Sequence, residues 1–334
     1  MNFIIEETSM KDLFLVVNPI AGGGRVNKIW TDEIKPLFDK NEVDYDYEMT
    51  THPQHAIEIA RAKVNEGYQI ICSIGGDGTA NEVINGILKA DRKGIFAAFA
   101  IGTGNDVPSV FGLPELDIDA ALDCLINGQD MDFDIGYCKN ADRYFVGVAS
   151  MGFDAEVADR TNKRGKKKKG KFNYEIAIFE TILKFRPYDV VITPSDSPPI
   201  EGKRMLIAIG NGKRYGAGMH ICPSAEVTDN KFAGTTLRKV SRFTLLRLFR
   251  LIYDGKHIDH PKVDTFEGAE IHVESLNKKC LYQIDGEIMG NLPETFITKP
   301  KAITVRVPKH WRSYSEIWQA KLNQKYKKKE KGKK

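Results

Sequence analysis

Gly75-Gly76-Asp77-Gly78-Thr79-Ala80-Asn81-Glu82 separates an apolar run from a segment with helical periodicity. The apolar run, residues 68–74, has the length and the β-branched content of a buried strand. The apolar residues after the glycines recur at the spacing of one helical face: Val83, Ile84, Ile87 and Leu88. The glycines therefore occupy a strand-to-helix turn, where backbone N–H groups and the helix dipole favour a bound phosphate.

Asp77 is the unexpected member of this turn, because a carboxylate repels a bare phosphate. A divalent cation between the two groups, or a hydroxyl on the ligand, resolves the conflict. The simpler alternative is a helix N-terminus that happens to carry an aspartate, and a single Gly-Gly-x-Gly turn would favour it. Two further glycine turns reverse that preference.

Both further turns also follow buried strands. Residues 13–17 precede Asn18-Pro19-Ile20-Ala21-Gly22-Gly23-Gly24, after which a helical pattern runs from about Val26 to Phe38. Residues 95–101 precede Gly102-Thr103-Gly104-Asn105-Asp106, which again carries a carboxylate. Because the carboxyl ends of parallel strands meet at one edge of a sheet, the three turns should line one ligand-binding edge.

The order of the predicted elements indicates two domains. Strands and helices alternate up to about residue 128, which predicts an α/β domain with a parallel, helix-covered sheet of Rossmann-like type. Within it, residues 43–49 read as a strand, and Thr50-Thr51-His52-Pro53 as the cap of a helix that continues to Asn65.

After Gly128 most elements are strands joined by loops, which predicts a largely antiparallel β domain. The predicted strands are residues 131–138, 144–151, 188–193, 205–210, 232–240, 265–274 and 280–284, and the predicted helices are about 172–185 and 242–253. Residues 302–307 and the amphipathic segment after Trp311 are candidates to rejoin the first domain.

Composition limits the class of protein. The chain has 334 residues, 42% of them hydrophobic and 28% charged, which is ordinary for a two-domain globular enzyme. Residues 1–7 do not resemble a signal peptide, and no apolar run approaches the roughly 20 residues of a membrane-spanning helix. The five cysteines include no Cys-x-x-Cys pair, so neither a disulfide framework nor a zinc site is indicated. We expect a reduced, cytoplasmic protein.

Two basic runs stand apart from an acidic body. Residues 163–171 and residues 321–334 each have a net charge of +7, so the rest of the chain carries −10 of the overall +4. Localised lysine runs attract a polyanion, either an anionic lipid surface or a nucleic acid. A solubilising loop and tail are the alternative.

Several motif matches carry little weight. Residues 165–171 have the spacing of a Walker A loop, but Phe172 replaces its Ser/Thr and no strand precedes it. Asp285-Gly286-Glu287 closes a predicted strand. It reads either as a surface hairpin tip, the usual place for Asp-Gly, or as an acid/base or metal-binding group.

Taken together, Asn18-Pro19-x-x-Gly22, residues 75–82, Gly102–Asp106 and Asp285-Gly286-Glu287 resemble the bacterial soluble diacylglycerol/lipid kinase family. That family is related to sphingosine kinases, and the resemblance covers about residues 12–310 in order and spacing. It implies an α/β ATP-binding domain of the NAD-kinase and diacylglycerol-kinase type, an antiparallel β-sandwich that receives the lipid, and an active site in the cleft between them. The implied domains are 1–128 completed by 303–325, 129–302, and a basic tail 326–334.

The resemblance also implies the site residues. It places ATP on Asn18, Pro19, Ile20, Ala21, Gly22, Thr51, Gly75, Gly76, Asp77, Gly78, Thr79, Ala80, Asn81, Glu82 and Thr103. Thr50 competes with Thr51, because the local spacing differs by about one residue.

Two carboxylates acquire catalytic roles through the resemblance. Asp77 would belong to the Mg²⁺–phosphate network, and Glu287 would be the general base that takes the proton from the lipid hydroxyl. A structural Mg²⁺ of the family would fall on Glu226, Asp229 and the carbonyl of Lys231. There the sequence reads Thr-Asp-Asn where Asp-Asp-Gly is usual, so the charge is lower, although Asn230 can adopt the left-handed turn.

The resulting prediction is a cytoplasmic ATP:lipid kinase that associates peripherally with an anionic membrane through its basic segments. No specific nucleic acid is expected, and a homo-oligomer is left open. An NAD kinase shares the Gly-Gly-Asp-Gly turn and the two-domain plan, but Asn-Pro-x-x-Gly and Asp-Gly-Glu argue against it. A non-catalytic anion-binding regulator predicts salt-sensitive nucleic-acid binding without ATP turnover.

Overall fold

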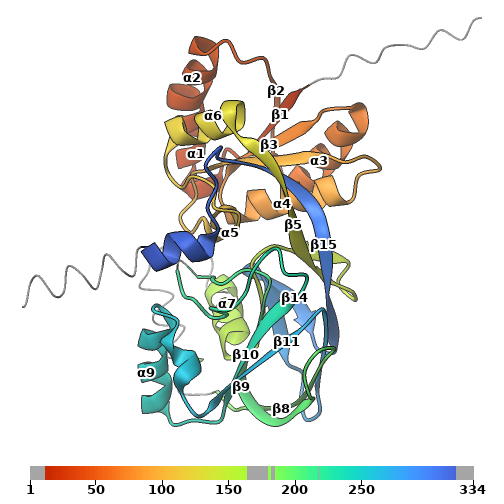
Figure 1. Ribbon diagram of the computed structural model, residues 1–334, viewed down its shortest axis with the longest axis vertical. Helices are drawn as coiled ribbons and strands as arrows, with labels where there is room; N and C mark the ends of the chain where they lie inside the picture. Colours follow the sequence, from red (N-terminus) through yellow and green to blue (C-terminus); the bar gives the residue numbers. More distant parts are fainter. Residues whose placement is uncertain (1–11, 164–179, 182–184, 217, 321–334) are drawn as a thin grey trace, which may run out of the picture. The chain divides into compact units, whose positions relative to one another are not determined.

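The computed structural model describes residues 12–163, 180–181, 185–216 and 218–320, and it divides into two compact units (Figure 1). Unit 1 runs to Phe133 and includes Lys301–Ser313, and unit 2 comprises Asp134–Pro300 and the chain from Tyr314 on. The chain passes from one unit to the other within β5 (Gln129–Cys138) and again within β15 (Glu294–Val307).

Unit 1 contains a parallel sheet in the order β15-β4-β3-β1-β2. Its strands are β1 (Leu13–Val17), β2 (Asp46–Met49), β3 (Ile70–Gly75) and β4 (Ile95–Ala100), joined by the end of β15 through Thr304 and Val305. The apolar side chains of the central strands are buried on both faces, as the continuous hydrophobic runs predict.

Helices cover both faces of that sheet (Figure 1). One face carries α6 (Ile118–Asn127) and a continuous helical segment made of α1 (Arg25–Ile29), a π turn (Trp30–Ile34) and α2 (Lys35–Lys40). The other face carries α3 (His55–Glu66) and α4 (Asp77–Leu88). A 3₁₀ turn (Ala21–Gly23) and the short α5 (Asp106–Val110) lie in the loops that follow β1 and β4.

Unit 2 is an antiparallel β-sandwich. Its strands follow the order β14-β13-β7-β9-β8-β12-β15, β10 pairs with β9 and β11, and β5 pairs with β6. Their bounds are β6 (Arg143–Phe145), β7 (Val148–Gly152), β8 (Tyr188–Pro194), β9 (Ile200–Gly210), β10 (Phe232–Arg238), β11 (Val263–Gly268), β12 (Glu270–Ser275), β13 (Leu281–Ile284) and β14 (Glu287–Asn291). The first half of β9 pairs with β8 and its second half with β7, so one strand serves two parts of the sandwich.

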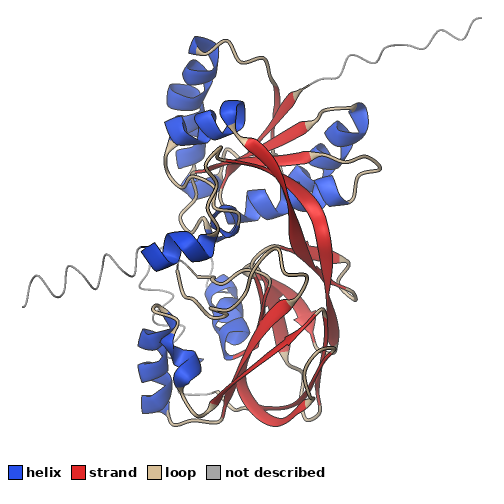
Figure 2. Ribbon diagram, viewed as in Figure 1, coloured by secondary structure: helices blue, strands red, loops and turns tan. Residues whose placement is uncertain are grey.

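Two helices cover one face of the β7–β9–β10 sheet (Figure 2). They are α7 (Phe153–Lys163) and α9 (Arg242–Ile252), and a 3₁₀ turn (Lys256–Asp259) follows the second. The opposite face of these strands packs into the sandwich core, which holds Phe145, Phe232 and Phe296. The predicted fold class, a Rossmann-like α/β domain followed by an antiparallel sandwich, is confirmed.

Several predicted elements differ from those observed. The helix predicted to be capped at residues 50–53 begins at His55, with Gln54 as its N-cap at φ +66° and no side-chain cap. The strands predicted at 144–151 and 265–274 are each interrupted and form β6 with β7, and β11 with β12. Neither α7 nor β14 was predicted. These breaks occur at glycine-containing segments whose turns depend on tertiary contacts, which apolar periodicity does not report.

The segment after β15 divides between the units. Trp311 Nε1 donates to the carbonyl of Phe111 at 2.7 Å and its ring packs on Phe133, which fixes residues up to 313 in unit 1. From Tyr314 the chain groups with unit 2, because Tyr314 and Trp318 stack on the His220 ring. The first domain predicted from sequence had included residues 303–325 as a whole.

Burial of His220 should make the free energy of unfolding depend on pH. Burial lowers the pKa of His220 to about 4, so between pH 6.5 and 4 the unfolded chain binds a proton that the folded chain does not. We expect the free energy of unfolding to fall by about 2 kcal/mol over this range through His220 alone. Urea unfolding at pH 7 and pH 4.5 should show this component in the wild type and not in His220→Phe. Equal losses in both proteins would contradict it.

No helix among the described residues is long and apolar enough to cross a membrane. Three predicted segments lie wholly or mostly outside the described residues. They are the basic run 163–171, the helix at 172–185 and the tail 326–334.

Candidate active site

The turn after β3 has the predicted strand-to-helix geometry. Strand β3 ends at Gly75, Gly76 is the N-cap of α4, and Asp77 is the first helical residue. Within the described part of the chain no side chain caps this helix end, since the N-cap residue is itself a glycine. A Cβ on Gly75 would lie 2.6 Å from Thr79 Oγ1, so the turn requires glycine there for close packing. The first-turn amides of α4 are therefore presented at a turn that bulky side chains do not cover.

The turn after β4 packs directly on the turn after β3. A Cβ on Gly102 would lie 2.5 Å from Gly76 Cα, so the two backbones approach as closely as glycine permits. Asn105, at φ +54°, precedes α5, and its Nδ2 donates to the carbonyl of Ala100.

Asp77 lies where these two turns meet. Its Oδ1 accepts from the backbone N–H of Val107 at 2.8 Å, in the first turn of α5. A Cβ built on Gly104 would lie 2.7 Å from Asp77 Oδ2 and 3.6 Å from Asp106 Oδ2, so the two carboxylates flank that glycine. The structure thus brings together the two aspartates that the sequence placed in separate turns.

The turn after β1 is tied to both of the others. Asn18 Nδ2 donates to Thr79 Oγ1 at 3.0 Å, and Arg25 Nη2 donates to the carbonyl of Ile101 at 3.1 Å. Asn18 Oδ1 is buried and has no hydrogen-bond partner among the described residues. Gly22, Gly23 and Gly24 all have positive φ, a conformation that glycine adopts without steric cost. The three predicted glycine turns therefore form one structure, which we call the glycine corner.

Gly104 tests the position of Asp77 in the glycine corner. A Cβ at Gly104 would lie 2.7 Å from Asp77 Oδ2 and would displace that carboxylate. We expect Gly104→Ala to lower kcat about 10²-fold through misplacement of Asp77. Kinase assays and urea unfolding of this variant check this, and wild-type turnover in a folded Gly104→Ala protein would exclude a positional role for Gly104.

Thr51 and Glu82 each make a hydrogen bond to a residue at the start of α3. The backbone N–H of Thr51 donates to His55 Nδ1 at 3.1 Å, and Glu82 Oε1 accepts from the backbone N–H of Gln54 at 3.2 Å. The loop that carries Thr51 is thereby fixed to α4. Ile20 is 69% exposed, and Thr103 is also exposed. The side chains of these two predicted ATP-binding residues are therefore open to solvent and do not pack in the core.

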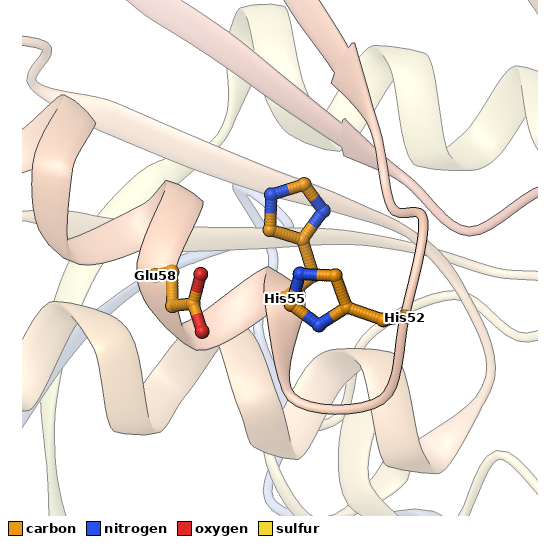
Figure 3. A group of neighbouring side chains, drawn as sticks. All are labelled: His52, His55 and Glu58. Carbon is orange, nitrogen blue, oxygen red and sulfur yellow. The ribbon is translucent and has the colours of Figure 1, made fainter.

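His52, His55 and Glu58 form a potential metal-binding group, with ligand atoms within 4.8 Å of one another (Figure 3). Because His55 Nδ1 accepts from Thr51, its proton lies on Nε2, which is 3.6 Å from Glu48 Oε1. Neutral His55 thus has no lone pair left for a metal, and its contacts instead hold the Thr51 loop.

In unit 2, Asp285 and Gly286 form the two-residue turn between β13 and β14. Both have positive φ, +46° and +90°, as a type I′ hairpin turn requires. The Asp285 carboxylate accepts from the backbone N–H groups of Val146, Gly147 and Val148 at 2.8, 2.9 and 3.1 Å. The Asp-Gly pair therefore forms a hairpin tip, as one of the two interpretations of this motif predicts. The Asp285 carboxylate has a structural role in that tip.

Glu287 begins β14 and keeps an accessible carboxylate. Its side chain is 42% exposed, and Oε2 accepts from Arg143 Nη2 at 3.1 Å. Arg143 is itself almost buried, so it can orient the Glu287 carboxylate without covering it. The carboxylate is therefore oriented by Arg143 and remains partly open to solvent.

The predicted structural metal residues have other partners in unit 2. Glu226 accepts from Lys213 Nζ at 2.8 Å and from Ser315, Asp229 accepts from the N–H of Lys231, and Lys231 Nζ pairs with Glu267. Burial raises the pKa of Asp229. Asn230 has φ +62°, the left-handed conformation expected of it. Because the Lys213 ammonium already neutralises Glu226, this donor set as arranged does not fit a divalent cation.

Sequence reasoning missed the residues that position these groups. Arg143 lies 144 residues from Glu287, and Arg25 lies 76 residues from Ile101. Asp134 is buried and accepts from the N–H of Asn230 at 2.7 Å. No local motif marks such residues, because each acts through a partner that is distant in sequence.

Unit 2 also contains an apolar cavity of about 30 Å³ beneath α9. Its lining includes Phe153, Leu206, Leu237, Leu245, Leu248 and Ile252. Polar groups at its wall are few, among them Thr235 and the buried His257. Its volume is far below the roughly 300–1,000 Å³ of a ligand pocket, so it is a small void in the apolar packing beneath α9.

Comparison with known families agrees with both units. Residues 12–138 match the Diacylglycerol kinase catalytic domain, and residues 147–307 match the YegS C-terminal NAD kinase beta sandwich-like domain. These matches define a two-domain kinase in which a glycine-rich α/β catalytic domain precedes a β-sandwich.

Individual relatives indicate more closely which kind of kinase family the chain belongs to. The chain is 30% identical over 299 residues to a diacylglycerol kinase of Mycobacterium tuberculosis, covering 88% of this chain and 94% of the relative. It is also 30% identical over 295 residues to a diacylglycerol kinase of Staphylococcus haemolyticus, covering 88% of each. A crystal structure of a diacylglycerol kinase from Bacillus anthracis has the same fold, with 18% identity, a TM-score of 0.66 and coverage of 89% of this chain and 97% of that one. The protein belongs to the diacylglycerol kinase family.

Proposed function

We propose that this kinase transfers the γ-phosphoryl group of ATP to the hydroxyl of a diacylglycerol-like lipid. The observation that carries the proposal is the glycine corner. Three glycine turns are hydrogen-bonded together at the carboxyl ends of parallel strands, with Asp77 at the start of a helix that no side chain caps.

The glycine corner supplies what phosphoryl transfer needs from a nucleotide site. Transfer depends mainly on holding the phosphates in place and neutralising their charge. Amides at the N-terminus of α4 and those of Gly22 and Gly23 can bind phosphate oxygens, and the buried Asn18 Oδ1 can accept from a nucleotide donor group.

Asp77 and Asp106 would hold Mg²⁺, because two carboxylates that flank the same glycine are the hard oxygen donors this ion prefers. When bound, Mg²⁺ neutralises charge on the transferred phosphoryl group. The link between Asp77 and the Val107 amide keeps its second oxygen oriented toward Gly104.

Glu287 would act as the general base on the acceptor. As the lipid oxygen attacks the γ-phosphorus, its proton passes to the Glu287 carboxylate, and the bond from the γ-phosphorus to the bridging oxygen breaks to release ADP. Arg143 donates to Oε2 of this carboxylate and fixes its orientation. The proposal requires that Glu287 and the glycine corner act on the same pair of substrates.

A lipid acceptor is supported over NAD by the names of similar proteins. Relatives that are 30% identical to this chain over 88% of its length are named diacylglycerol kinases. Such an acceptor resides in a bilayer, so the enzyme would meet it at a membrane surface.

The acceptor can be identified directly. Purified protein is incubated with Mg²⁺ and γ-labelled ATP, in parallel with diacylglycerol vesicles, a total lipid extract and NAD. We expect a labelled organic-phase product whose mass equals that of an acceptor lipid plus one phosphate. Label in NADP with none in lipid would instead establish an NAD kinase.

A further inference from the structure

Helix α9 has two different faces. Its inner face, which includes Leu245, Leu248 and Ile252, is buried against the β9–β10 sheet and forms part of the wall of the apolar cavity. The outer face points away from that core, and Figure 1 shows α9 at the edge of unit 2. A helix that packs on one side normally exposes polar residues on the other.

The outer face of α9 departs from that rule. Phe243 is 86% exposed, Leu246 48% and Tyr253, the C-cap residue, 52%. The positions 243, 246, 250 and 253 recur at helical spacing, so these side chains lie along one stripe. Scattered single apolar residues need no explanation, but a stripe of them on one helix marks a contact surface.

Arginines are interleaved with this stripe. Arg242, Arg247 and Arg250 are exposed, and no acidic residue occurs in Arg242–Ile252. Lys239 is exposed one turn before the helix. The surface is therefore cationic and apolar at once, a combination that matches an anionic headgroup layer above hydrocarbon.

We propose that the outer face of α9 docks on an anionic lipid surface. Phe243 and Leu246 insert below the headgroups, and Arg247 and Arg250 bind lipid phosphates through their guanidinium groups. Tyr253, with its apolar ring and polar hydroxyl, suits the headgroup boundary. The positive charges of the exposed Arg247 and Arg250 favour an anionic lipid surface over an apolar protein partner.

Docking in this way gives the proposed kinase its route to the acceptor, and to that extent the inference rests on the proposed function. The same helix forms part of the wall of the apolar cavity, so its docking brings that wall to the lipid surface. Binding itself does not require ATP, Mg²⁺ or a diacylglycerol acceptor, so it can be tested separately from turnover.

The test is cosedimentation of the full chain with vesicles of phosphatidylcholine, with or without 30% phosphatidylglycerol, and with no ATP or diacylglycerol. Arg247→Glu/Arg250→Glu and Phe243→Ser/Leu246→Ser are each compared with the wild type. Each arginine near an anionic surface contributes about fivefold to binding. We therefore expect both double variants to lower the partition coefficient on anionic vesicles at least tenfold.

Matched controls distinguish vesicle binding by this face from general electrostatic attraction by the basic runs. Lys28→Glu/Lys40→Glu makes the same change in net charge on exposed positions of unit 1, and Leu276→Ser removes an apolar side chain that is 62% exposed elsewhere in unit 2. We expect each control to change binding less than threefold. Urea unfolding confirms that all variants are folded.

Three results would overturn the proposal. The first is that the wild type does not bind anionic vesicles. The second is that Arg247→Glu/Arg250→Glu and Lys28→Glu/Lys40→Glu lose vesicle binding equally. The third is that light scattering shows a wild-type dimer, which Arg247→Glu/Arg250→Glu dissociates. The last would assign the face to a second copy of the chain. A protein that docks normally but phosphorylates no lipid would refute the proposed function and leave this inference intact.

Discussion

Asp77→Asn is expected to lower kcat by at least about 10²–10³-fold and to leave the fold unchanged. Asparagine keeps the Oδ1 acceptor that binds the Val107 amide at 2.8 Å, so the contact between the two turns survives. What it loses is the negative charge beside Asp106 that would bind Mg²⁺. The measurement is kcat and KM for ATP over a range of Mg²⁺ concentrations, together with urea unfolding.

Asp32→Asn is the matched control, because it removes one negative charge from an exposed position of unit 1 outside the glycine corner. It should keep near wild-type activity. A loss of stability by more than about 1 kcal/mol in Asp77→Asn would assign Asp77 a structural role. Undiminished turnover in a folded Asp77→Asn protein would remove it from the catalytic site altogether.

Glu287→Gln should lower kcat by about 10²–10⁴-fold, the usual contribution of a general base. Glutamine still accepts from Arg143, so β14 and its hairpin should remain in place. The affinity for ATP should change little, because the residue acts on the acceptor hydroxyl. Rates under saturating ATP and lipid, with a separate ATP-binding measurement, distinguish these effects.

Glu267→Gln provides the comparison, since Glu267 is also a half-exposed glutamate of unit 2 paired with a cation, Lys231. Its rate should remain within about twofold of wild type, as expected for a surface ion pair. If Glu287→Gln and Glu267→Gln had the same rate, another group would have to accept the proton.

The architecture could be predicted because its signals are local. Buried strands such as Leu13–Val17 and Ile95–Ala100 are continuous apolar runs, and each is followed within a few residues by glycines. Alternation with helices then specifies a parallel sheet, which brings the three turns to one edge.

The details of the site could not be predicted in the same way, because they depend on contacts distant in sequence. Asp285 appeared in a catalytic-looking motif, yet its carboxylate binds three amides of the β6–β7 connection. Glu226 appeared as a metal ligand, yet the nearly buried Lys213 reaches it. Phe243 and Leu246 lie in the helix predicted at about 242–253, but the sequence does not report which apolar side chains of that helix stay exposed.

The measurement that tests the central claim most directly follows ³²P from ATP into a lipid. Wild-type protein is incubated with Mg²⁺, diacylglycerol vesicles and ATP labelled at either the α or the γ position, and the organic phase is counted. Label should appear only from γ-labelled ATP, and it should be lost in Asp77→Asn and Glu287→Gln. An organic phase that stays unlabelled with every lipid offered, while ATP binds to the folded protein, would contradict the assignment as a lipid kinase.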